Sequence, residues 1–151
     1  MVKAVNTSGY KFAVMTPPME ANSSVKKVSF KIKECSSNWV AVGMCHRSIV
    51  ASKNYGFHFS QIGHGGYLVS ANGGIWSHCN KDQNNAIKGF KFSKNDVITI
   101  EVVAGEGRIV FRRNKDSQTI NYDASIKEPL SPCALFYYLN DEVELLTNLQ
   151  G

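Results

Sequence analysis

Cysteine and histidine are the residues of this sequence best suited to chemistry, and they adjoin one another at two places, Cys45-His46 and His78-Cys79. A catalytic cysteine needs a general base within hydrogen-bond reach. Adjacent residues of a strand point to opposite faces, so His78 is poorly placed to activate Cys79. No Asp or Glu stands at a position that would orient the histidine. The two pairs therefore give no support to a nucleophilic enzyme.

The same residue types could bind a metal ion, with His46, His58, His64, His78 and the cysteines as the available ligands. None of the spacings C-x-x-C, H-x-x-x-H and H-E-x-x-H occurs. Convergence of the two Cys-His pairs across a sheet remains the alternative. We predict no metal and no cofactor, and we interpret the cysteines as buried thiols, because three of them lie in or beside apolar runs.

Two further patterns resemble catalytic sites only superficially. The glycine-rich stretch 63–66 would need a strand before it and a helix after it to bind phosphate, yet Tyr67 opens a strand-like run. Glu142 and Glu144 share one face of a final strand that we expect to face solvent, whereas glycoside hydrolysis needs two acids across a cleft. We predict that the chain is not an enzyme.

The elements that position these residues have a period of two. Val28, Phe30 and Ile32 alternate with polar residues, which indicates a half-buried strand. Residues 39–45 are almost entirely apolar, which indicates a strand covered on both faces, and residues 55–59 alternate again. No stretch keeps a helical apolar period over several turns.

Turn signals separate these strands about every ten residues. Asn72-Gly73 predicts a hairpin because both residues tolerate positive φ, and residues 105–107 predict a second one. Short strands joined in this way predict an all-β fold, a twisted antiparallel β-sandwich. The predicted core consists of Val28, Phe30, Ile32, Trp39, Val42, Ile98, Ile100, Phe111, Leu135, Val143 and Leu145.

Three residues have predicted architectural roles. Gly43 lies in mid-strand, where a bulky neighbour such as Trp39 or Phe136 is expected to cover it. Asp96 is placed to cap the turn before a long strand. Trp76 needs an acceptor for its indole N–H if it is buried.

Composition and charge limit the remaining possibilities. The chain has 151 residues, of which 43% are hydrophobic, and we predict a single domain over residues 1–151. The first residues lack the apolar core and cleavage site of a signal peptide, and no apolar run reaches the roughly 20 residues that a membrane span requires, so we expect a soluble, intracellular, cytoplasmic protein without membrane contact. The net charge of +5 comes from scattered residues, so nucleic acid is not the expected partner.

The order of these motifs resembles a SPRY domain. The stretches that carry the resemblance are Trp39–Gly43, Tyr67–Gly73, Ile75–His78, Phe92–Ile98, Ile109–Asn114, Leu130–Leu135 and Asp141–Leu145. The match covers about residues 28–147, and residues 1–27 are expected to supply an edge strand and a loop. The resemblance implies a β-sandwich that serves as a protein–protein interaction module or adaptor, with a protein or peptide bound by loops at one end.

In SPRY modules of the SOCS-box kind, a tyrosine after a long loop and a Trp-Gly pair before the last strand hold an extended peptide. Tyr55 is similar to that tyrosine, whereas the Trp-Gly position holds Asn140-Asp141. The residues that we predict to bind the partner are Lys53, Asn54, Tyr55, His64, Asn84, Tyr138, Asn140 and Asp141.

Two other functions remain open from the sequence. A constitutive structural subunit of a large intracellular assembly would expose a large apolar patch when isolated. A ligand-binding β-domain would need a deep pocket at one end. The docking module, in contrast, is expected to be monomeric alone.

Overall fold

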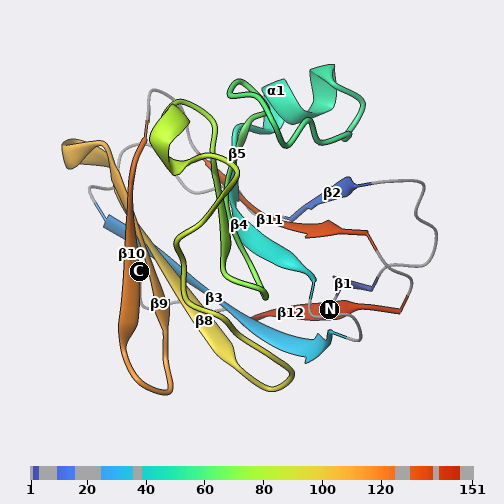
Figure 1. Cartoon of the computed structure of the whole chain (residues 1–151), viewed down its shortest axis with the longest axis vertical. Helices are drawn as coiled ribbons and strands as arrows, with labels where there is room; N and C mark the ends of the chain where they lie inside the picture. The colour runs from blue at the N-terminus through green and yellow to red at the C-terminus, as the bar shows by residue number, and fades with distance from the viewer. Residues whose placement is uncertain are drawn as a thin grey trace.

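Two antiparallel sheets of six strands each form the molecule (Figure 1). The computed structural model describes residues 2–3, 10–15, 25–35, 39–124, 130–137 and 140–146. Sheet A consists, in spatial order, of β1 (Val2–Lys3), β12 (Glu142–Leu146), β3 (Val25–Glu34), β8 (Val97–Val103), β9 (Arg108–Arg113) and β10 (Gln118–Asp123). Sheet B consists of β2 (Lys11–Val14), β11 (Ser131–Phe136), β4 (Ala41–Cys45), β5 (Gly66–Ser70), β6 (Gly74–Ser77) and β7 (Ala86–Ile87). The predicted all-β antiparallel sandwich is confirmed.

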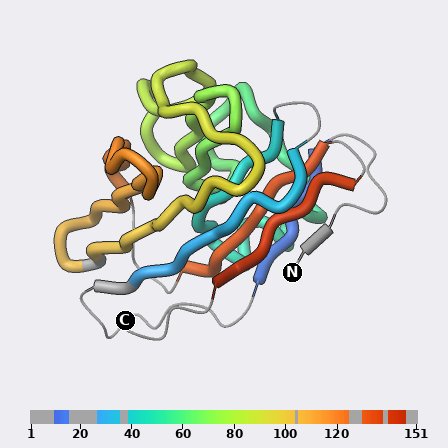
Figure 2. Tube along the Cα trace, turned by 90° about the horizontal axis from the view of Figure 1, so that it is seen from below, coloured from blue at the N-terminus to red at the C-terminus, as the bar shows by residue number. Residues whose placement is uncertain are grey.

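Strands that are neighbours in the sequence pair through short turns, as the turn residues predict. β5 and β6 form a hairpin at Asn72-Gly73, where Gly73 has a φ of 88°. β8 and β9 form the second hairpin, closed by the 3-10 helix η2 (Ala104–Glu106). In Figure 2, β12, β3 and β8 run side by side although they are far apart in the sequence.

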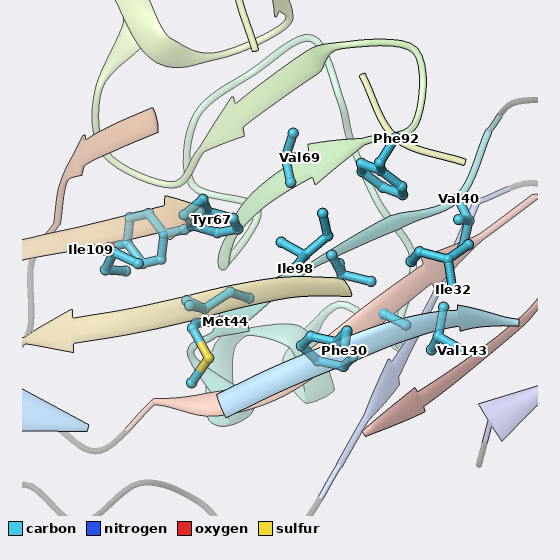
Figure 3. Packing of buried hydrophobic residues seen from close by; sticks show 14 of the residues in the cluster. Phe30, Ile32, Val40, Met44, Tyr67, Val69, Phe92, Ile98, Ile109 and Val143 are labelled. Atoms are coloured by element: carbon cyan, nitrogen blue, oxygen red, sulfur yellow. The ribbon is translucent and has the colours of Figure 1, made fainter. Parts of the chain in front are cut away.

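Alternate residues of both sheets fill the space between them (Figure 3). Phe30, Ile32 and Ile98 of sheet A meet Met44 and Tyr67 of sheet B, and all five are fully buried. Burying each large side chain stabilises the fold by roughly 1.5–3 kcal/mol. The buried apolar residues between the two sheets, called here the inner cluster, therefore account for most of the apolar burial of the sandwich.

The predicted core is largely confirmed. The predicted residues that are fully buried are Phe30, Ile32, Val42, Ile98, Ile100, Phe111, Leu135 and Val143. Val28 and Leu145 are only partly buried and pack against the inner cluster, and Trp39 is partly buried and packs against a different cluster.

That second cluster, called here the outer cluster, lies on the face of sheet B that points away from sheet A. Its buried members are Phe12, Ala41, Cys45, Val50, Phe57, Leu68, Trp76, Cys133 and Leu135. In β4 the side chains of Val42 and Met44 belong to the inner cluster, while Ala41 and Cys45 belong to the outer one. The apolar run 39–45 is thus covered on both faces, as predicted. Helix α1 (Arg47–Ser52) and the segment after it cover the outer cluster (Figure 1).

Helix α1 has no counterpart in the sequence prediction. Its six residues contribute one buried side chain, Val50, so no helical apolar repeat could reveal it. Residues 55–59, predicted as a strand, form only an isolated bridge between Gly56 and Lys11. No helix in the described part of the chain is long and apolar enough to cross a membrane.

The architectural predictions for Gly43 and Asp96 have different outcomes. A Cβ atom on Gly43 would lie 1.9 Å from the carbonyl oxygen of Tyr67, so the backbone of β5, and not Trp39 or Phe136, requires glycine. Asp96 accepts a hydrogen bond from the backbone N–H of Ser93 at 2.8 Å, which confirms the predicted turn cap.

The cysteines form no disulfide. Cys45 and Cys133 are buried and Cys35 is partly buried, but Cys79 is exposed because it follows the end of β6. Burial, together with the neighbouring Cys45 thiol, raises the pKa of Cys133 well above its usual value. The prediction of buried thiols is therefore wrong for Cys79.

One side chain closes part of the edge of sheet A. Gln83 lies in the 3-10 helix η1 (Lys81–Gln83) beside the edge strand β10. Its amide nitrogen donates to the carbonyl of Asn121 at 2.8 Å, and its amide oxygen accepts from the N–H of Asp123 at 3.2 Å.

Candidate functional site

The turn after α1 fixes Tyr55 in an unusual backbone conformation. Asn54, with φ 55°, donates its N–H to Ala51, and the N–H of Tyr55 reaches the carbonyl of Val50, both at 3.0 Å. These two bonds form a Schellman motif with asparagine in the place of the usual glycine.

Tyr55 itself has a φ of 62°, which costs a residue with a Cβ roughly 1–2 kcal/mol. Its carbonyl accepts a bond from the N–H of Phe12 at 2.9 Å, which ties the turn to β2. The Tyr55 side chain is 42% exposed. The surrounding structure thus holds a strained tyrosine in one backbone conformation while presenting its ring to solvent.

Four aromatic side chains form a patch beside this turn, called here the aromatic patch: Tyr10, Trp39, Phe59 and Tyr137. The ring centroid of Tyr10 lies 4.6 Å from that of Tyr137, 4.8 Å from that of Trp39 and 5.8 Å from that of Phe59. Phe59 and Tyr137 are 44% and 40% exposed, and the other two are partly buried. Four segments far apart in the sequence thus converge on one aromatic surface.

Phe57 and Trp76 are buried and pack against two rings of the patch, those of Tyr10 and Trp39. The Trp76 ring lies 5.9 Å from both Trp39 and Phe57, and it has space because Gly74, two residues earlier, carries no side chain. The indole N–H of Trp76 is buried and finds no acceptor among the described residues, contrary to the expectation from sequence. A buried donor without a partner costs about 1–3 kcal/mol.

Three histidines lie at the end of sheet B. His46 and His78 approach with ring centroids 4.8 Å apart, so the two Cys-His pairs do converge across the sheet. His46 also shares a 3.0 Å hydrogen bond with the Tyr67 hydroxyl. Within the described residues, however, no three His, Cys, Asp or Glu side chains are arranged to hold a metal ion.

His64 and His78 each use Nδ1 as an acceptor. His64 accepts from the N–H of Gly66 at 3.1 Å, and His78 accepts from the N–H of Gly65 at 2.9 Å. An Nδ1 atom that accepts carries no proton, so both rings are neutral. Burial lowers the pKa of His64 to about 4, and burial followed by the charges of His46 and Lys53 lowers the pKa of His78.

Asn84 connects this histidine pair to the aromatic patch. Its Oδ1 accepts from His64 Nε2 at 2.8 Å and from the N–H of Ser77 at 3.1 Å, and its Nδ2 donates to the Phe59 carbonyl at 3.1 Å. A concavity of about 500 Å³ lies here, lined by Ser60, Gln61, Ile62, Lys81 and Asn84. The histidine and the amide therefore hold the segment that carries Phe59 and Ile62.

The structure divides the residues predicted to bind a partner. Lys53, Asn54 and Tyr55 are consecutive and exposed, and Asn140 is exposed with a φ of 69°. Tyr138 lies outside the described residues.

His64 and Asp141 are 1% and 0% exposed, so they offer no surface to a partner, and Asn84 is partly buried.

Sequence reasoning missed Tyr10 and Phe59 as surface residues and assigned Trp39 to the core. It placed Ile62 and Tyr137 in surface loops but did not include them among the partner-binding residues. Tyr55, Phe57 and Phe59 alternate as strand residues do, which hid the fact that two of the three rings face solvent. The signal available in the sequence was the concentration of aromatic residues at positions 55–59.

No protein-family model and no curated protein matches this chain. Among solved structures, the SPRY domain of human HERC1 superimposes with a TM-score of 0.72 at 17% identity, over 96% of this chain and 87% of that one. A second human SPRY domain gives a TM-score of 0.68 at 17% identity, over 97% and 89%. The PSpry domain of TRIM65 gives 0.59 at 13% identity, over 84% and 66%. The two-sheet architecture and these superpositions establish that this chain has the fold of a SPRY domain.

Proposed function

We propose that this chain is a protein–protein interaction module that binds its partner through the outer surface of sheet B. The contact surface comprises the aromatic patch, the turn Lys53–Tyr55 and Ile62. The SPRY fold supports the general role, since the family serves in protein recognition. The single observation that carries the proposal is the aromatic patch, because clustered exposed apolar side chains mark interaction sites.

The composition of this surface fits a recognition site. Tyrosine and tryptophan are enriched among the residues that dominate binding energy, because they combine a large apolar area with a hydrogen-bonding tip. The Schellman turn and the Asn84 bonds hold the surface in place before a partner arrives. Such pre-organisation reduces the entropy lost on binding.

A second candidate function is that of a constitutive subunit. Ile87, on the edge strand β7, is 70% exposed, and a permanent assembly would cover it together with the aromatic patch. A docking module needs only the patch. Sedimentation of the purified chain distinguishes the two, because we expect a monomer from the module and self-association or poor solubility from an orphaned subunit.

The test of the proposed function is comparative capture from cell lysate with quantitative mass spectrometry. The wild-type chain, Phe59→Ala and the matched control Ile87→Ala are immobilised at equal density, after thermal melts have shown that all three are folded. We expect proteins retained by the wild type and by Ile87→Ala to be lost from Phe59→Ala. Identical capture by Phe59→Ala and the wild type would place the binding surface elsewhere.

A further inference from the structure

We infer that the partner segment bound by this surface is acidic and carries bulky apolar side chains, an inference that rests on the proposed function. The argument begins with the distribution of charge. The chain has 12 Asp and Glu residues, and none lies between Cys35 and Lys81. None lies in residues 10–15 or 130–137 either. The described segments that carry the aromatic patch and the Lys53–Tyr55 turn are therefore free of acidic residues.

Three cations occur in these segments, Lys11, Arg47 and Lys53. Lys53 is exposed immediately before Asn54-Tyr55, and neither it nor Arg47 has an ion-pair partner among the described residues. Arg47 is exposed at the start of α1, at the other end of β2 from Tyr10, where its guanidinium donates to the carbonyl of Met15 at 3.1 Å. That bond fixes the position of the charge without neutralising it.

Sheet A shows the opposite arrangement. On its outer face Lys27 pairs with Glu101 at 3.4 Å, and Lys33 pairs with Glu144 at 3.9 Å. Two of its cations are thus paired within the sheet, whereas Lys53 is paired with no described residue. Uncompensated charge of one sign attracts a partner of the opposite sign and repels its own.

The apolar requirement comes from the rings. Tyr55, Phe59 and Ile62 are each about 40% exposed, at 42%, 44% and 39%. A purely polar acidic segment would leave this area in water, while a basic segment would be repelled by Lys53. An acidic segment with aromatic or large aliphatic side chains satisfies both features.

A single-stranded nucleic acid also combines negative charge with flat apolar surfaces. Such ligands need a groove of cations that follows their phosphates. The described segments around the patch offer three unpaired cations, Lys11, Arg47 and Lys53, and Arg47 lies at the far end of β2 from the patch, so the structure favours the peptide.

The experiment is a selection of random peptides displayed on phage against the full chain. We expect the selected peptides to be enriched in Asp and Glu beside Phe, Tyr, Trp or Leu. One such peptide is then synthesised with a fluorophore and titrated against the wild type and three variants, Phe59→Ala, Lys53→Glu and Lys88→Glu. Lys88→Glu is the matched control, because it makes the same charge change after β7, at the other edge of sheet B.

We expect Lys53→Glu to weaken binding by about tenfold, and more at low than at high salt because the charges are exposed. Lys88→Glu should bind within about twofold of the wild type. Phe59→Ala should weaken binding at every salt concentration. Thermal melts of each variant verify that it is folded.

Each outcome has a distinct meaning. Neutral or basic peptides whose binding depends on Phe59 overturn the inference but leave the proposed function standing. Acidic peptides that bind Phe59→Ala as well as the wild type contradict the proposed surface itself. Failure to select any peptide overturns the inference, which requires a linear segment, while the capture experiment still decides the function. A labelled single-stranded oligonucleotide that binds more tightly than the peptide, and whose binding depends on Phe59, overturns the inference and identifies nucleic acid as the partner.

Discussion

The inner and outer clusters are both apolar, yet they are built on different principles. The inner cluster lies between two paired sheets, and residues such as Phe30 and Ile100 are completely enclosed. The outer cluster is covered by a six-residue helix and an irregular segment, and its margin opens into the aromatic patch. Paired strands enclose the first from both sides, whereas the cover of the second is held by single hydrogen bonds such as that from the Asn84 amide to the Phe59 carbonyl. The main source of stability and the proposed recognition surface therefore lie in separate layers of one molecule.

The largest effect is expected from the inner cluster. Phe111 is fully buried and packs edge-on against Tyr122 with ring centroids 4.9 Å apart. Phe111→Ala should lower the free energy of unfolding by about 3–5 kcal/mol, because it removes the ring and leaves a cavity. Urea denaturation measures the change. A loss below about 1 kcal/mol would show that the inner cluster is not the main source of stability.

Lowering the pH should destabilise the fold through His64, which packs against Phe57 of the outer cluster. The pKa of His64 is about 4 in the folded chain against 6.5 in the unfolded chain, so the unfolded state binds the proton first as the pH falls. Stability is complete above pH 6.5 and falls between pH 6.5 and about 4, by about 3 kcal/mol in total. Urea denaturation across this range measures the decline. His64→Gln removes the titrating group, so its stability should vary less with pH, and an unchanged pH profile would contradict this assignment.

The strain at Tyr55 can be separated from its contribution to binding. Tyr55→Gly and Tyr55→Ala both remove the ring, but alanine retains the unfavourable positive φ. Tyr55→Gly should therefore be the more stable of the two by about 1 kcal/mol, as measured by thermal denaturation. Both should weaken binding of the selected peptide equally. Unequal loss of binding would mean that the backbone, and not the ring, determines recognition.

The smallest effects are expected from reagents that act on metals or thiols. Chelator and reductant should leave the melting temperature unchanged, because the described cysteines form no disulfide and the described side chains form no metal site. A thiol reagent should modify Cys79 in the native state and reach Cys45 and Cys133 only after unfolding, since these two are buried. A shift of the melting temperature by several degrees with the chelator would indicate a metal site, and one with the reductant would indicate a disulfide.

The inner layer was predictable from the sequence and the outer layer was not. Alternation at Val28, Phe30 and Ile32 reports a strand directly, because its period is a property of neighbouring residues. Tyr10, Trp39 and Tyr137 meet only after sheet B has formed, so no local pattern connects them.

Tyr55 and Lys53 could be identified as surface residues because turn residues mark the position. His64 could not be assigned to the interior, since the Asn84 amide that bonds its Nε2 lies 20 residues further along the chain.

The position of Gln83 has a consequence for how copies of this chain meet in solution. β10 is an edge strand, and its outward N–H and C=O groups would otherwise form a template for pairing with a strand of another molecule. The Gln83 amide occupies one donor and one acceptor of that edge, as a residue of a neighbouring strand would. A side chain from η1 thus blocks strand pairing at one end of β10, the kind of contact that leads to aggregation and domain swapping.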